Sequence, residues 1–327
     1  MNIQESKPGP NWVPYKIIPE NNVIACQWLY VKNKAFTEPF FSETIQQCKL
    51  LPENNYLLKQ LTDFELLPVW SREINSVTPT AFIFHVSRCG STLASQLLSL
   101  EPKHIVLSEV PFFDDILRLP FNKKAGASLK QTDNYFKAAV RFYAQKRTGE
   151  ENNLFIKTDS WHLFFYKQIR KVYPSVPFII MYRTPYEIIR SQKRLRGMQS
   201  VPGIIEAELF GFEEQDITYD LDLYMSRVLE KYYRKVLEIM ENDPFCILLN
   251  YKEGMEAIMK RIIAYTGISA SAAYLNKIKE RSQFHGKYPN QIFSETPATE
   301  NPPPYLQKCL ELYDAIEEKR RAFFKGS

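Results

Sequence analysis

The feature that most constrains the fold is a regular alternation of strand-like and helix-like segments that begins near residue 80. Short apolar runs, suited to strands with both faces buried, alternate with amphipathic helical patterns. This arrangement is typical of an α/β fold with a parallel sheet covered on both sides. The predicted strands are 81–86, 104–107, 154–157, 177–182 and 245–250. The predicted helices lie near 92–100, 111–118, 133–147, 161–172, 185–198, 218–241 and 254–265, with a closing helix over 305–324.

The region before this alternation has a different character. Residues 1–14 contain several prolines and are expected to be a loose start, whereas the residues that follow mix a strand-like run at 23–31 with a helical stretch near 41–50. We therefore predict an N-terminal α+β appendage, a subdomain or cap, over residues 1–78. The α/β domain is predicted to span 79–327.

Charge and cysteine content exclude several classes of protein. The 42 Lys and Arg against 37 Asp and Glu give a net charge of +5, which suits an anionic ligand but not a nucleic-acid surface. The five cysteines are scattered, so neither a disulfide framework nor a zinc site is expected. No apolar run approaches the ~20 residues that span a bilayer, and the N-terminus lacks an apolar signal core. We expect no membrane span and a cytoplasmic location.

The turn after the first of these strands reads SRCGSTL, residues 87–93, and runs directly into a helical pattern. Gly90 lets a backbone approach a phosphate closely, and the helix N-terminus presents N–H groups and a positive dipole end. Ser91 and Thr92 add hydroxyl groups, and Arg88 adds a permanent charge. This pattern predicts a phosphate site, although a well-capped strand-to-helix turn would have the same residues. The Gly-x4-Gly-Lys-[Ser/Thr] signature of nucleotide hydrolases is missing.

A second candidate anion site follows the strand 177–182. Arg183 stands at its carboxyl end, where ligands of open α/β sheets bind. Ser191 lies about two helical turns further along the next helix. The pair could hold a second phosphate, or it could be a helix N-terminal arginine and an ordinary exposed serine.

Together these motifs resemble the sulfotransferases that use 3′-phosphoadenosine-5′-phosphosulfate (PAPS). In that family a loop of the type [Lys/Arg]-x-Gly-[Ser/Thr]-[Thr/Ser] binds the 5′-phosphosulfate. An arginine at a strand end, with a serine eight positions later, binds the 3′-phosphate. A third segment, 245–269, is similar to the family's late strand–turn–helix, although it reads Tyr-Lys-Glu-Gly in place of the usual Tyr-Glu-Asp-Leu. The resemblance covers roughly residues 80–285.

The resemblance implies a P-loop-type parallel sheet flanked by helices, and sulfuryl transfer from PAPS to a hydroxyl acceptor without a bound metal. The acceptor's identity and the oligomeric state stay open. The residues implied to bind the donor are Arg88, Cys89, Gly90, Ser91, Thr92, Arg183 and Ser191.

The catalytic residues that the resemblance implies are Glu109, Arg88 and Lys157. In the tyrosyl-protein branch of the family a glutamate just after the second strand is the general base, and Glu109 follows the strand 104–107. The cytosolic small-molecule branch uses Lys-x-His instead; here Lys157 fits, but Asp159 replaces the histidine. Glu109 is thus the first candidate base and Asp159 the second. We expect the apolar residues 110–113 to raise the pKa of Glu109.

Arg88 is expected to stabilise charge on the leaving phosphate, and Lys157 either contacts the transferred group or caps the sheet edge. Late basic residues, namely Arg281, His285 and Lys287, are further candidates for nucleotide contact. Two alternative functions are a nucleotide-dependent kinase or phosphotransferase on the same sheet, and a non-catalytic nucleotide-binding protein.

Overall fold

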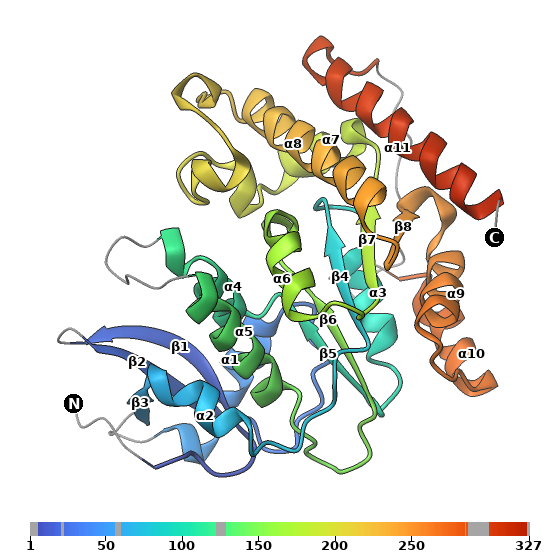
Figure 1. Cartoon of the computed structure of the whole chain (residues 1–327). Coiled ribbons are helices and arrows are strands. Elements are labelled where there is room, and N and C mark those ends of the chain that lie inside the picture. Colours follow the sequence, from blue (N-terminus) through green and yellow to red (C-terminus); the bar gives the residue numbers. More distant parts are fainter. Residues whose placement is uncertain are drawn as a thin grey trace.

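A five-stranded parallel sheet forms the centre of the protein (Figure 1), which confirms the predicted α/β class. The computed structural model describes residues 6–20, 23–55, 60–121, 129–284, 286 and 301–325. The strand order is β5-β6-β4-β7-β8. The strands are β4 (Ala81–His85), β5 (His104–Ser108), β6 (Asn153–Lys157), β7 (Phe178–Tyr182) and β8 (Cys246–Asn250).

Helices cover both faces of this sheet because successive strand residues are apolar on both sides. Ala81 and Ile83 of β4 pack into one hydrophobic cluster, whereas Phe82 and Phe84 pack into the other. The first face is covered by α3 (Ser91–Leu98), α9 (Met255–Thr266) and α10 (Ala272–Arg281). The second face is covered by α4 (Pro111–Leu117), α5 (Leu129–Tyr143), α6 (Tyr166–Val172), α7 (Pro185–Arg194) and α8 (Leu221–Asn242).

The predicted helices are present, but several boundaries differ. Helix α5 ends at Tyr143 because the chain then turns to pair Gln145 with Ser76. Helix α7 ends at Arg194, where Leu195 has an extended backbone. The segment expected to begin helix α6 is a 3₁₀ turn over Ser160–Phe165. Among the described residues, no helix is long and apolar enough to cross a bilayer.

The N-terminal residues form a three-stranded antiparallel sheet with two short helices. Its elements are β1 (Trp12–Glu20), β2 (Val23–Tyr30), β3 (Leu61–Asp63), α1 (Phe41–Cys48) and α2 (Leu67–Ser71). The expectation of a loose start through residue 14 is wrong at its end, because β1 already begins at Trp12. Pro14 is tolerated because β1 is an edge strand and its pairing with β2 shifts register between Pro14 and Lys16.

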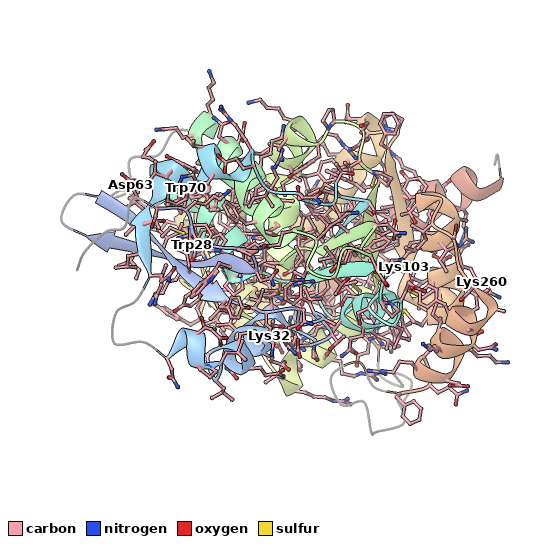
Figure 2. The ribbon with its side chains drawn as sticks, turned by 90° about the horizontal axis from the view of Figure 1, so that it is seen from below. Trp28, Lys32, Asp63, Trp70, Lys103 and Lys260 are labelled. Carbon is pink, nitrogen blue, oxygen red and sulfur yellow. The ribbon has the colours of Figure 1, made fainter. Side chains whose placement is uncertain are left out.

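This N-terminal sheet packs against α4 and α5. The ring of Trp28 lies 4.8 Å from that of Phe142 and 6.4 Å from that of Trp70. Figure 2 shows these two tryptophans on the side of the molecule opposite to Lys260. Residues of both regions belong to one hydrophobic core. The division after residue 78 stays a prediction.

The C-terminal helix α11 (Gln307–Lys325) packs along α8 (Figure 1) and is attached to the sheet by one buried carboxylate. Glu317 accepts hydrogen bonds from the Tyr182 hydroxyl at the end of β7 and from Asn250 Nδ2 at 2.6 Å. Arg320 donates to the same carboxylate at 3.0 Å. Burial alone would raise the pKa of Glu317, but these partners outweigh it and lower the pKa to about 2.

Replacing this carboxylate is expected to weaken the whole domain. The substitution Glu317→Gln should reduce the free energy of unfolding by about 2–3 kcal/mol at pH 7, because it leaves buried donors without a charged acceptor. Glu317 has a lowered pKa, so its contribution is fully present above ~pH 4.3 and is lost as the pH falls toward 2. Urea unfolding of both proteins at pH 7 and pH 3 checks this.

The matched control is Glu311→Gln, which removes an exposed carboxylate from the same helix. It should leave the urea midpoint unchanged. Equal effects of the two substitutions, or a Glu317→Gln effect that does not shrink at low pH, would contradict the anchoring role.

Candidate functional site

A cavity of about 580 Å³ opens at the carboxyl edge of the parallel sheet, and every strand contributes to its wall. Ligands of open α/β folds bind at this edge because the segments that follow parallel strands gather there. The segments that line the cavity are 87–93 after β4, Glu109 after β5, 159–161 after β6, Arg183 and parts of 190–199 after β7, and Tyr251 after β8.

The turn between β4 and α3 has an unusual backbone. Ser87, Arg88 and Gly90 all have positive φ angles, of 70°, 51° and 81°. The Ser87 side chain is held by two amides, since its Oγ accepts from Gln192 Nε2 at 3.1 Å and from Gln199 Nε2 at 2.8 Å. Two non-glycine residues in this conformation cost on the order of 1 kcal/mol or more each and are most often found at functional sites. The unusual backbone of this turn is therefore held in place by tertiary contacts, as is typical of a functional site.

Arg88 and Cys89 have opposite orientations in this turn. The half-buried guanidinium group of Arg88 donates to the carbonyl of Leu195 across the cavity. The thiol of Cys89 points to the sheet and donates to the carbonyl of Met181 at 3.3 Å. Burial raises the pKa of Cys89 to about 11, so this side chain is a neutral thiol and a poor nucleophile.

Arg183 lies on the other side of the same turn. It is buried, its Nη1 donates to the carbonyl of Arg88 at 3.4 Å, and its Nε donates to Glu187 at 3.3 Å. Its guanidinium group also stacks 4.2 Å from the ring centre of Tyr251. Ser191 lines the cavity further along α7. The two predicted anion sites thus share one cavity.

Glu109 stands directly after β5 with a φ of 52°, and its carboxylate contacts two other strands. It accepts a hydrogen bond from Lys157 Nζ, and its Oε1 lies 3.4 Å from His85 Nε2. His85 Nδ1 accepts a hydrogen bond from the Ser87 backbone N–H at 3.2 Å, so the ring proton is on Nε2. This N–H faces both Glu109 and the carbonyl oxygen of Thr158, which lies 3.0 Å from Nε2. His85 is therefore neutral, and burial lowers its pKa further.

The expected pKa shift of Glu109 is wrong in direction. Burial does tend to raise its pKa, as expected from the apolar residues 110–113, but the charge of Lys157 and the contact with His85 outweigh burial. The pKa of Glu109 therefore lies well below its usual range. The carboxylate is ionised and ready to accept a proton, but it is a weak base while Lys157 is paired with it alone.

Asp159 lines the cavity beside a cluster of hydrogen-bonded side chains. His162 Nε2 donates to Asp114 Oδ1 at 3.0 Å, and Asp114 also accepts from Trp161 Nε1 at 2.5 Å and from Arg118 at 2.9 Å. Acidic and imidazole atoms of the cluster lie within 4.8 Å of one another, but protein donors already occupy the oxygens of Asp114. Burial and the charges of Glu109 and Asp114 raise the pKa of Asp159 well above its usual range.

The cavity carries a strong positive charge. Five arginines line it, against two carboxyl groups, Glu109 and Asp159, and the pKa of Asp159 is raised by burial and by its negative neighbours. The arginines are Arg88, Arg183, Arg190, Arg194 and Arg196. Arg196 is partly neutralised by Asp222 at 2.6 Å. Such a cavity favours a ligand with several negative charges.

The sequence model of the sulfotransferase family matches residues 79–270, which is more than half of the chain and includes the strands, the turn and Arg183. The chain belongs to the sulfotransferase family. No curated protein sequence matches it.

This sulfotransferase is also similar in fold to solved structures at low sequence identity. Sulfotransferase STF9 from Mycobacterium avium has a TM-score of 0.46 and 14% identity, covering 79% of this chain and 78% of that one. A sulfotransferase from Alicyclobacillus acidocaldarius has a TM-score of 0.44 and 17% identity, covering 76% and 96%. The sulfotransferase domain from the curacin biosynthetic pathway has a TM-score of 0.48 and 14% identity, covering 74% and 99%.

The structure brings most of the predicted site residues of this sulfotransferase together. The predicted donor-binding residues and Glu109 all line the cavity. Lys157 does not line it but donates a hydrogen bond to Glu109. Arg281 does not line the cavity; it donates to Gln96 at 2.7 Å and to the carbonyl of Phe284 at 3.2 Å. His285 and Lys287 lie outside the described residues.

Sequence reasoning missed three aromatic residues of the cavity, one of which is Trp161, two positions after Asp159. Tyr251 directly follows β8, and a residue just after a strand of a parallel sheet is expected at the carboxyl edge. The sequence therefore contained enough information to predict Tyr251 as a cavity residue. Phe40 comes from the N-terminal region, and its ring lies 5.3 Å from Lys157 Nζ. No local pattern connects Phe40 with a sheet that begins about 40 residues later.

Gly90 is expected to be irreplaceable in this sulfotransferase. A Cβ atom at this position would lie 2.8 Å from Tyr251 Cδ2 and 3.1 Å from Met255 Cε, in a backbone with φ of 81°. Gly90→Ala should therefore lower the free energy of unfolding by about 2–4 kcal/mol, from backbone strain plus overpacking. Thermal and urea unfolding measure the change.

Gly149→Ala is the matched control, because Gly149 has a similar φ of 88° but no atom within 4 Å of the added Cβ. It should cost only about 1 kcal/mol from strain. Adding Tyr251→Ala to Gly90→Ala should recover part of the loss. Equal effects of the two glycine substitutions would show that the contact with Tyr251 does not constrain the turn.

Proposed function

We propose that this sulfotransferase transfers the sulfuryl group of PAPS to a hydroxyl acceptor, with Glu109 as general base. One observation carries the proposal: the turn at 87–93, the pair Arg183 and Ser191, and Glu109 line a single cavity. Two anion sites in one cavity match the two charged ends of the donor. A carboxylate beside them matches the need to remove the acceptor's proton.

The donor fits the chemistry of the cavity. Backbone N–H groups at the start of α3, together with Arg88, would bind the 5′-phosphosulfate. Arg183 and Ser191 would bind the 3′-phosphate. In the turn, Ser91 follows Gly90 at the position where the nucleoside-triphosphate signature has its lysine. Family membership and this missing lysine both favour sulfuryl transfer over the kinase alternative.

The transfer breaks one bond and forms one bond. The acceptor oxygen attacks the sulfur, a new O–S bond forms, and the S–O bond to the 5′-phosphate breaks. The leaving 3′,5′-diphosphate keeps the bond's electron pair, which Arg88 would stabilise. The acceptor's proton passes to Glu109. A neutral His85 beside Glu109 keeps the carboxylate oriented without adding a charge.

Lys157 controls how readily Glu109 accepts a proton. Its ammonium group is fully buried and paired with Glu109. When the phosphosulfate is bound, the sulfuryl oxygens would offer Lys157 a second anionic partner. Sharing of this charge would raise the basicity of Glu109 at the step that needs it. The glutamate-base branch of the family is therefore the one that we propose for this chain.

Turnover is expected to depend on Glu109 and Arg88. Glu109→Gln should lower kcat by about 10²–10⁴, the contribution of a general base, and Arg88→Ala by about 10²–10³. The measurement is release of adenosine 3′,5′-diphosphate from PAPS with a screened acceptor. Glu318→Gln, an exposed site on α11, should retain the parent rate. Near-parent rates in both cavity variants would exclude this mechanism.

Donor affinity is expected to depend on Arg183. Arg183→Ala should weaken the binding of adenosine 3′,5′-diphosphate by about ten- to a hundredfold, the value of a charge-assisted hydrogen bond. Calorimetry measures the Kd, and Arg234→Ala, on the exposed side of α8, is the control. ATP with Mg²⁺ should raise the melting temperature less than the diphosphate does. An unchanged Kd in Arg183→Ala would count against the 3′-phosphate site.

The pH dependence of turnover tests the pairing of Lys157 with Glu109. Lys157 lowers the pKa of Glu109, so Glu109 stays ionised at pH values below the usual pKa of a glutamate. In the parent enzyme, kcat/KM should therefore fall only when the pH drops below that usual pKa. Lys157→Met removes the charge and leaves burial, so the acid limb should move upward. Rates from pH 5 to 8 measure it, with Lys167→Met at an exposed lysine as control. Identical acid limbs would show that Glu109 is not the base or is not controlled by Lys157.

A further inference from the structure

The carboxyl group of Asp159 faces the cavity and accepts no hydrogen bond from the residues that the structure describes. It follows β6 by two residues, lines the cavity, and is only 8% exposed. Among the described residues, no side chain or backbone group donates a hydrogen bond to its carboxyl group. The nearest basic atom, His162 Nε2, lies 3.7 Å away, which is beyond hydrogen-bond distance. A carboxyl group that lines a cavity and has no hydrogen-bond donor from the protein is open to a ligand.

The neighbouring network does not need Asp159. The Nε2–H of His162 is already donated to Asp114, and Trp161 and Arg118 complete the hydrogen bonds of Asp114. His162 therefore has no proton on that nitrogen to spare for Asp159. The position is also more than a structural cap, because its neighbours Ser160 and Trp161 line the cavity as well.

The charges around Asp159 favour its neutral form. Two negative groups face it from neighbouring elements, and burial adds to their effect, whereas the positive groups are committed to other partners. The charged or titratable groups that face it are Glu109, Asp114, Lys157, Arg118 and His162. A neutral carboxylic acid can both donate and accept a hydrogen bond, which a carboxylate cannot.

Three large apolar side chains line the cavity together with Asp159 and Glu109. Trp161 is two residues from Asp159, Phe40 lies over Lys157, and Met198 stands at the rim with 47% of its surface exposed. This rim segment belongs to the same side of the cavity as Glu109, because Gln199 binds Ser87, which in turn binds His85. The part of the cavity that would receive the acceptor thus combines three apolar side chains with the carboxyl group of Asp159.

We propose that Asp159 hydrogen-bonds a second, uncharged oxygen of the acceptor, whose apolar body packs against Phe40, Trp161 and Met198. The acceptor class is then an uncharged phenol or lipid-like alcohol with a hydroxyl, ether or carbonyl oxygen next to the reacting hydroxyl. This inference rests on the proposed function and names the substrate class of the same site. It gives Asp159 a role in acceptor recognition and leaves Glu109 as the base.

The test compares acceptors that differ only in the second oxygen. Phenol and catechol form one pair, and 1-octanol and 1,2-octanediol form the other. In the parent enzyme we expect kcat/KM to be about five- to tenfold higher for the dioxygenated member of at least one pair, the value of one hydrogen bond. Asp159→Ala should reduce this ratio to about one, because it removes the group that contacts the second oxygen. Asp159→Asn, which keeps a neutral donor and acceptor, should retain the ratio within about threefold.

Several outcomes would overturn the inference. A ratio that survives in Asp159→Ala would show that another group recognises the second oxygen. A loss of about 10² or more with every acceptor in Asp159→Asn would make Asp159 the base. Absence of turnover with both pairs, in protein that binds adenosine 3′,5′-diphosphate, would exclude this substrate class and leave the proposed function standing. Failure to bind the diphosphate would instead contradict the proposed function.

Folding is checked by thermal unfolding of each variant. The control is Asp133→Asn, a buried aspartate on α5 that pairs with Lys171 at 2.9 Å and does not line the cavity. It should alter stability without changing the ratio between paired acceptors. A similar change of ratio in this control would show that the effect of Asp159 is general and not due to acceptor contact.

Discussion

The parallel alignment of five strands is the constraint on which the rest of the site depends. Each strand ends at the same edge, and the residues just beyond each end face one cavity: Arg88, Glu109, Asp159, Arg183 and Tyr251. These residues span more than 160 positions of the sequence, yet the parallel strands alone bring them close together, because each residue directly follows a strand that ends at this edge. An antiparallel strand in this sheet would place its following residues at the opposite edge.

Backbone strain is concentrated where these strand ends meet. Ser87, Arg88 and Glu109 all have left-handed backbones, which non-glycine residues seldom adopt. Each is held by contacts from another part of the fold. The amides of Gln192 and Gln199 bind Ser87, Arg183 donates to the carbonyl of Arg88 at 3.4 Å, and the Glu109 N–H donates to the carbonyl of Lys157 at 2.8 Å. The strain thus persists because tertiary contacts fix it, and its effect is to aim an arginine and a glutamate into the same space.

The sequence was sufficient for features that depend on local patterns. The strands were predictable because apolar runs are signals within short segments, and Gly90, Arg183 and Ser191 were recognisable as residues of the cavity wall because their motifs directly follow two of these strands. Strand β1 was not, because Pro14 argues against a strand unless its place at a sheet edge is known. Phe40 was not, because only the packing of the N-terminal sheet against α4 and α5 brings it to the cavity.

The two carboxyl groups of the cavity show why ionisation could not be predicted in the same way. The residues next to Glu109 in sequence are apolar and suggest a raised pKa, but its partner in space is Lys157, 48 positions away, which has the opposite effect. Asp159 is two positions from the same lysine, yet the ammonium group is directed to Glu109, and Asp159 is left among negative neighbours. One buried cation therefore separates the pKa values of the pair, since it lowers that of Glu109, whereas burial and negative neighbours raise that of Asp159. The direction of the Lys157 side chain decides which of the two carboxyl groups has the lowered pKa.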